Sequence, residues 1–132
     1  PIPKSKSGTR QIIKRLQNNE HLGFLIDQKY NEGVAVPFFH APAMVSPAYI
    51  QLAQKFECPL IPAQIERVNK INFRVTIHPP LDIKNKTEEE LLCETHLMLE
   101  DWIKQNPEQW LWLHRRWASS QLEEGKTSND RI

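Results

Sequence analysis

The fold class is indicated most clearly by three consecutive segments, PLIPAQIE (59–66), INFRVTIH (71–78) and TEEELLCETHLMLEDWIKQ (87–105). Apolar and polar residues alternate in the second segment, which is the period of a β-strand, and RVNK (67–70) predicts a hairpin connection to the first. The third segment opens with a capping box, Thr87 with Glu90, and its apolar residues recur at helical spacing. The stretch therefore predicts two paired strands followed by a long helix.

Further elements are expected on both sides of this stretch. The sequence predicts helices over 8–19, from Ser46-Pro47 to before Cys58-Pro59, and over PEQWLWLHRRW (107–117), with strands over 22–26 and 34–39. This order predicts an α/β fold, with a mixed β-sheet flanked by helices. Residues 1–117 are expected to form one domain, and the polar residues 118–132 a disordered tail.

Composition excludes several classes of protein. The 132 residues suit one domain, and 39% hydrophobic with 25% charged residues excludes wholesale disorder. Seventeen Lys and Arg against sixteen Asp and Glu give a net charge of +1, which argues against a nucleic-acid-binding function. The two cysteines, Cys58 and Cys93, lack CxxC spacing, so a disulfide scaffold is excluded and reduced thiols are expected.

Residues 33–54 contain no Asp, Glu, Lys or Arg and have about the length of a membrane-spanning helix. Pro37, Pro42 and Pro47 interrupt this stretch, and each removes a backbone donor and clashes with the preceding helical turn. A continuous helix is therefore excluded. The stretch is expected to be buried or to line an apolar site.

Two candidate site segments lie at the ends of the expected strands. Asp27-Gln28 comes at the end of the strand expected over 22–26, where a carboxylate can orient a cationic or hydrogen-bonding group, although the spacing alone favours a turn-capping Asp. VPFF (36–39) could form the wall of an acyl-chain or aromatic pocket, and the alternative is that Phe38 and Phe39 simply belong to the core.

The segment 110–117 (WLWLHRRW) is dense in tryptophan and arginine. As a helix it would place Trp110 and Trp117 on one face, with His114 beside it. Tryptophan beside arginine suits a lipid-headgroup boundary, where guanidinium binds phosphate. The alternatives are nucleic-acid binding, or a tryptophan face packed on the sheet with the arginines in ion pairs.

The string His96–Asp101 matches an H-x4-D pattern, but both residues lie in the expected helix 87–105 and five positions turn them 140° apart. We therefore interpret His96 as a surface or boundary residue and not as a general base. No histidine has metal-ligand spacing, and the sequence lacks a Gly-rich phosphate loop and a GxSxG elbow. No metal or cofactor is predicted.

Taken together, these segments resemble the late (lauroyl/myristoyl) acyltransferases of bacterial lipid A biosynthesis, in the lysophospholipid acyltransferase superfamily. The resemblance covers about residues 8–117 and rests on LIDQ (25–28), GVAVPFF (33–39), APA (41–43), LA (52–53), CPLIP (58–62) and PEQWLWLHRRW (107–117). The chain departs at His40, where the family usually has glycine or another small residue.

The resemblance implies transfer of a fatty acyl group from acyl carrier protein to a hydroxyl of a lipid A precursor, at the cytoplasmic face of the bacterial inner membrane. It implies that Asp27 supports the catalytic site and that the acyl chain and anionic groups of the substrate are bound by other residues. These are Gln28, Phe38, Phe39, His114, Arg115 and Arg116. Trp110, Trp112 and Trp117 would face the membrane interface.

The family's catalytic H-x4-D/E motif would lie upstream of Pro1, so the chain looks like the C-terminal portion of such an enzyme and is expected to be inactive alone. Two alternatives remain at this point. The chain could be a non-catalytic module that binds anionic lipid, or a degenerate gene fragment that has no stable fold.

Overall fold

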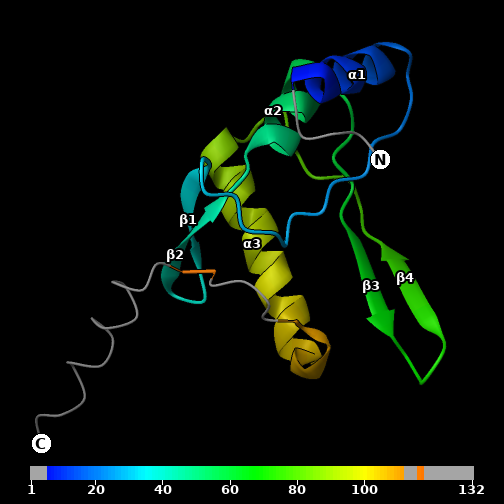
Figure 1. Ribbon diagram of the computed structural model, residues 1–132, viewed down its shortest axis with the longest axis vertical. Helices are drawn as coiled ribbons and strands as arrows, with labels where there is room; N and C mark the ends of the chain where they lie inside the picture. The colour runs from blue at the N-terminus through cyan, green and yellow to red at the C-terminus, as the bar shows by residue number, and fades with distance from the viewer. Residues whose placement is uncertain (1–5, 112–115, 118–132) are drawn as a thin grey trace, which may run out of the picture.

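The computed structural model of the protein describes residues 6–111, 116 and 117. Its elements are α1 (Lys6–Gln17), β1 (Val34–Phe38), β2 (Ala41–Val45), α2 (Ala48–Lys55), β3 (Ala63–Arg67), β4 (Phe73–Ile77), α3 (Glu88–Gln105) and the 3-10 helix η1 (Pro107–Gln109). Figure 1 shows α3 between two hairpins, β1–β2 and β3–β4, with α2 near its N-terminal end. The α/β class is confirmed. Both described strand pairs are antiparallel, so two separate hairpins stand where one mixed sheet was expected.

The capping box predicted for α3 is formed. The Thr87 hydroxyl oxygen accepts the Glu90 N–H at 3.2 Å, and a Glu90 carboxylate oxygen accepts the Thr87 N–H at 2.7 Å. Glu88 and Glu89 add negative charge to the first turn, where the helix dipole is positive. The predicted helix is confirmed to its last residue, Gln105.

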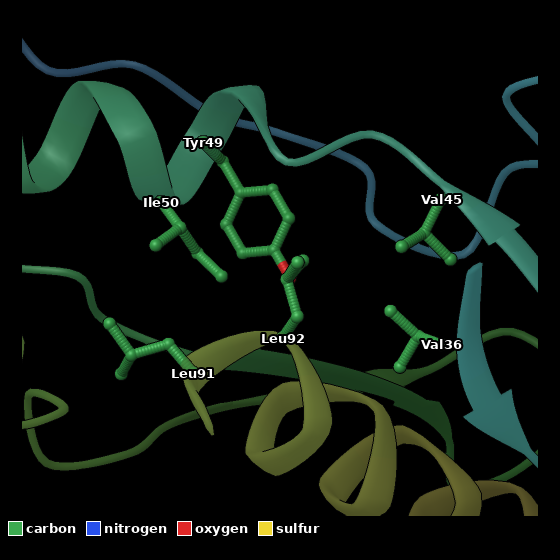
Figure 2. Packing of buried hydrophobic residues seen from close by; sticks show 6 residues of the cluster. All are labelled: Val36, Val45, Tyr49, Ile50, Leu91 and Leu92. Atoms are coloured by element: carbon green, nitrogen blue, oxygen red, sulfur yellow. The ribbon is translucent and has the colours of Figure 1, made fainter. Parts of the chain in front are cut away.

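The core lies between α3, α2 and the β1–β2 hairpin. Figure 2 shows its larger cluster, which comprises Val36, Val45, Tyr49, Ile50, Leu91 and Leu92. A second cluster continues along α3 and comprises Phe38, Ala43, Leu99 and Ile103. The proline-containing stretch 33–54 supplies seven buried residues, and its other residues are half-buried or exposed. Each large side chain fully removed from water contributes about 1.5–3 kcal/mol.

Residues 41–45 form a strand that the sequence analysis did not predict. Pro37 pairs with Pro42, one step from the closing pair Phe38–Ala41. At alternate positions of an antiparallel ladder the backbone N–H points away from the partner strand, so a proline there removes no ladder hydrogen bond. Both prolines are therefore compatible with the hairpin.

The β1–β2 hairpin is closed by Phe39 and His40 alone, with φ angles of 48° and 65°. Two consecutive residues in the left-handed region are the signature of a type I′ turn, which favours Asn and Gly. A Cβ at Gly33, at the other end of β1, would lie 1.8 Å from the carbonyl oxygen of Val45, so this position accepts only glycine. The hairpin is thus constrained at both ends, by the left-handed turn residues at one end and by the lack of space for a side chain at the other.

The β3–β4 hairpin confirms the predicted pairing, with Ile65 opposite Val75. Its polar side chains lie on the side of α3, whereas Ile65, Val75 and Ile77 are 68%, 58% and 64% exposed. The predicted alternation is present, and its apolar side faces outward.

Two expected elements are absent from the described residues. Residues 22–26 have no strand partner and Leu25 is 76% exposed, so the expectation of a buried strand there is wrong. Of the expected helix 107–117, the described residues 107–111, 116 and 117 form only η1, which ends where Trp110 has extended backbone angles of −88° and 122°. The expected tail, residues 118–132, lies outside the described residues.

Candidate functional site

A pocket of about 300 Å³ lies between residues 24–27, β3 and the C-terminal half of α3. Its apolar lining residues are Phe24, Leu25, Ile26, Ala63, Ile65, Leu99, Trp102, Ile103 and Trp110. Its polar side chains are Asp27, Gln64, Glu66, Asn106 and Gln109. An apolar pocket with few polar groups is typical of a small-molecule site, and this volume lies at the lower end of the range for such sites.

The apolar surface of the pocket is an extension of the core, because the same face of α3 that packs on the core also lines the pocket. Leu99 and Ile103 are each 7% exposed, and Trp102 beside them stacks on His78 of the segment after β4, with ring centroids 5.0 Å apart. On the opposite wall, Phe24 approaches Tyr49 of α2, with ring centroids 6.5 Å apart.

Most polar groups of the pocket are engaged in joining β3 to the end of α3. The Asn106 amide donates to Glu66 at 3.1 Å. The Gln109 side chain accepts the backbone N–H of Arg67 at 2.7 Å and donates to its carbonyl oxygen at 3.0 Å. Asp27 remains as an exposed carboxylate at the pocket, so the sequence prediction singled out a residue that lines it.

Buried polar side chains lie beside the pocket, next to Phe38. His96 is completely buried, with its Nδ1 2.8 Å from the carbonyl oxygen of Leu92. The Nδ1 therefore carries the hydrogen and the Nε2 is an acceptor, 3.5 Å from Nη2 of Arg116. Burial lowers the pKa of His96, although the hydrogen bond to Leu92 opposes this effect. The expectation that His96 lies at the surface is wrong.

Arg116 is 4% exposed. Its Nη1 donates to the backbone carbonyl of Asp27 at 3.1 Å, and its guanidinium carbon lies 5.3 Å from the centre of the Phe38 ring. Burial lowers the pKa of Arg116, and the charge of Asp27 opposes this effect. Thus the guanidinium joins three parts of the chain that are distant in sequence.

The β1–β2 turn lies against α3 through a buried carboxylate. Glu100 is 6% exposed, and its Oε1 accepts the backbone N–H of Phe39 at 2.8 Å. Its other oxygen lies 3.5 Å from the ammonium group of Lys104. This contact holds one residue of the left-handed turn in place.

The sequence model of the bacterial lipid A biosynthesis acyltransferase family matches residues 2–119. The chain belongs to this family. The comparison with curated proteins finds no match.

For this member of the lipid A acyltransferase family, the structure corrects the proposed role of VPFF. Phe38 has no exposed surface and packs among Phe39, Trp110 and Trp117, with ring centroids 4.8, 6.4 and 6.0 Å away. It is therefore a core residue, as the alternative interpretation stated, and is not in the pocket wall. Phe39 is half-buried and also does not line the pocket.

The structure places Arg116 in the interior and Trp117 half-buried against the second core cluster. Arg116 is buried against Asp27 and His96, so it is not available to an anionic headgroup. The Trp117 indole donates to the carbonyl oxygen of Phe38 at 3.0 Å and packs on the core. Trp110 lines the pocket, and Gln28 is exposed away from it. Trp112, His114 and Arg115 lie outside the described residues.

In this acyltransferase family member, the sequence analysis missed His96 and Glu100 as buried polar residues. A signal was present, since Leu92, His96, Leu99 and Ile103 share one helical face by their spacing. Among the described residues, no group of His, Cys, Asp and Glu could hold a metal ion. No described helix is long and apolar enough to cross a membrane.

Proposed function

We propose that this chain supplies the acyl-chain pocket and the Asp27 wall of an enzyme that transfers a fatty acyl group from acyl carrier protein to a hydroxyl of a lipid A precursor. The observation that carries the proposal is the pocket at Asp27, apolar along α3 and bounded by one exposed carboxylate. The family match supports acyl transfer in lipid A biosynthesis as the reaction class. We place the reaction at the cytoplasmic face of the bacterial inner membrane.

The apolar walls are suited to an acyl chain, because burying its methylene groups is favourable by about 0.8 kcal/mol each. Asp27 at the pocket can accept a hydrogen bond from a hydroxyl or orient a neighbouring cation. In acyl transfer a base removes the hydroxyl proton, and the oxygen forms an ester bond to the carbonyl carbon as the bond from carbon to sulfur breaks. The thiolate of acyl carrier protein leaves and takes up the proton.

The chain alone is proposed to be unable to perform this step. The Nδ1 of His96 is bonded to Leu92, and its Nε2 faces the buried guanidinium of Arg116. A histidine that is completely enclosed in this way cannot accept a proton from a substrate. His96 is therefore not the base in this proposal, which takes the base from other polypeptide, as the family resemblance implies.

The binding role is tested by titrating the chain with dodecanoate and following tryptophan fluorescence, since Trp102 and Trp110 line the pocket. Leu25→Gln changes an exposed side chain of the pocket wall, and Leu97→Gln is the matched control on the outer face of α3, 59% exposed. We expect a saturable change that is weakened about threefold or more by Leu25→Gln only. Equal effects of both variants, or no binding, would contradict the pocket assignment.

The catalytic role is tested by incubating the chain with dodecanoyl-acyl carrier protein and a lipid A precursor. We expect binding without formation of an ester product. Product formed by residues 1–132 alone would refute the statement that the base comes from elsewhere.

A further inference from the structure

The pocket wall formed by residues 24–27 is held in an unusual way. Within the described part of the chain, residues 21–28 make no backbone–backbone hydrogen bond. Leu25 is 76% exposed, and the wall meets the larger core cluster through Ile26 and through the Phe24 ring, whose centroid lies 6.5 Å from that of Tyr49. A wall without secondary structure needs another contact to keep its position.

Arg116 makes that contact. Its Nη1 donates to the carbonyl oxygen of Asp27 at 3.1 Å from a position that is 4% exposed. A hydrogen bond from a charged donor is stronger than a neutral one, and it is stronger still where water is excluded. The charge of Asp27 also attracts the guanidinium.

The guanidinium is itself oriented from two sides. The Nε2 of His96 lies 3.5 Å from Nη2, and its acceptor character follows from the bond between Nδ1 and Leu92. The Phe38 ring lies under the guanidinium, 5.3 Å away. The next residue, Trp117, is anchored by its bond to the Phe38 carbonyl. Two rigid elements, α3 and β1, therefore determine where Nη1 points.

We propose that Arg116 is a positioning residue, which fixes the backbone of Asp27 and so holds its carboxylate at the pocket. The inference rests on the proposed function of the pocket. Arg116 would not touch the substrate in this role. It would act through Asp27, with His96 as the neutral acceptor that keeps the guanidinium in place.

The test compares the chain with Arg116→Met and with Arg74→Met, which removes an exposed arginine of β4. Backbone ¹⁵N relaxation reports the order parameter of each amide. We expect values near 0.85 for residues 24–27 in the unmodified chain and below about 0.6 in Arg116→Met, with α3 unchanged. Arg74→Met should leave both regions unchanged. Unchanged order at 24–27 in Arg116→Met would overturn the proposal.

A second measurement keeps the proposal testable if Arg116→Met does not fold. In the unmodified chain, both terminal nitrogens of Arg116 have a partner, so their hydrogens should give separate and slowly exchanging resonances. A single averaged resonance would overturn the proposal. Dodecanoate binding is measured in parallel, and we expect it to weaken about tenfold in Arg116→Met. If the unmodified chain does not bind dodecanoate while Arg116→Met still loosens residues 24–27, the proposed function fails and the positioning role stands.

Discussion

Replacing His40 by glycine is expected to stabilise the chain. His40 is the second residue of the two-residue turn between β1 and β2, with a φ of 65°, and its side chain is exposed. A residue with a Cβ costs roughly 1–2 kcal/mol in the left-handed region. Glycine removes this cost but adds about 0.5–1 kcal/mol through the greater freedom of the unfolded chain. The net expectation is a gain of about 1 kcal/mol in the free energy of unfolding.

The assay is urea unfolding followed by tryptophan fluorescence, with thermal unfolding as a second measure. We expect the urea midpoint to rise without a change in the slope, and the Tm to rise by about 3 °C. His40→Ala is the matched control, because it removes the imidazole and keeps the Cβ. It should give no gain. A His40→Gly chain that is less stable, or an alanine variant that gains as much, would refute the assignment of strain to the turn.

Three further predictions concern the fold. Gly33→Ala should lower the free energy of unfolding by about 3 kcal/mol, because its Cβ would lie 1.8 Å from a carbonyl oxygen, whereas Gly23→Ala, with no atom within 4 Å, should have little effect in the same urea assay. Burial lowers the pKa of His96, so below the unfolded pKa of about 6.5 the unfolded chain binds more protons than the folded chain. The free energy of unfolding should therefore decline as the pH falls from about 6.5. Urea midpoints measured from about pH 7.5 to 5 should show this decline, and His96→Gln should flatten it. Val75→Thr on the exposed side of β4 should raise the protein concentration at which light scattering detects association. An unchanged concentration threshold would show that this side of the hairpin does not drive association.

The parts of the fold that the sequence predicted well are those with local signals. The capping box of Thr87 and Glu90 defines the start of α3, and its spacing defines the buried face. The alternation in 71–78 and the short connection 67–70 define the β3–β4 hairpin. Each signal depends only on residues near one another in the chain.

The parts that the sequence did not predict depend on distant contacts. The strand β2 could not be predicted because proline normally argues against a strand. Pro37 and Pro42 fit the hairpin only because they pair opposite one another. Residues 22–26 are apolar enough for a strand, but no described strand pairs with them. A local pattern cannot show which partner is available.

The same reason applies to the candidate site. Asp27 could be singled out because the pattern of an apolar run followed by an acid is visible in the sequence, and in the structure it lines the pocket. The burial of Arg116 against Asp27 joins residues that are far apart, and composition alone favoured a surface role for an arginine. The sequence motifs were therefore enough to predict the family, whereas the contact between Arg116 and Asp27 is visible only in the structure.

The most direct test of the central claim is to locate bound dodecanoate by nuclear Overhauser effects in the isotopically labelled chain. We predict contacts between its methylene protons and the side chains of Leu99, Trp102 and Trp110, which line the pocket. Contacts confined to Val75 and Ile77 on the outer side of β4, or to no site at all, would contradict the assignment of this pocket to the acyl chain.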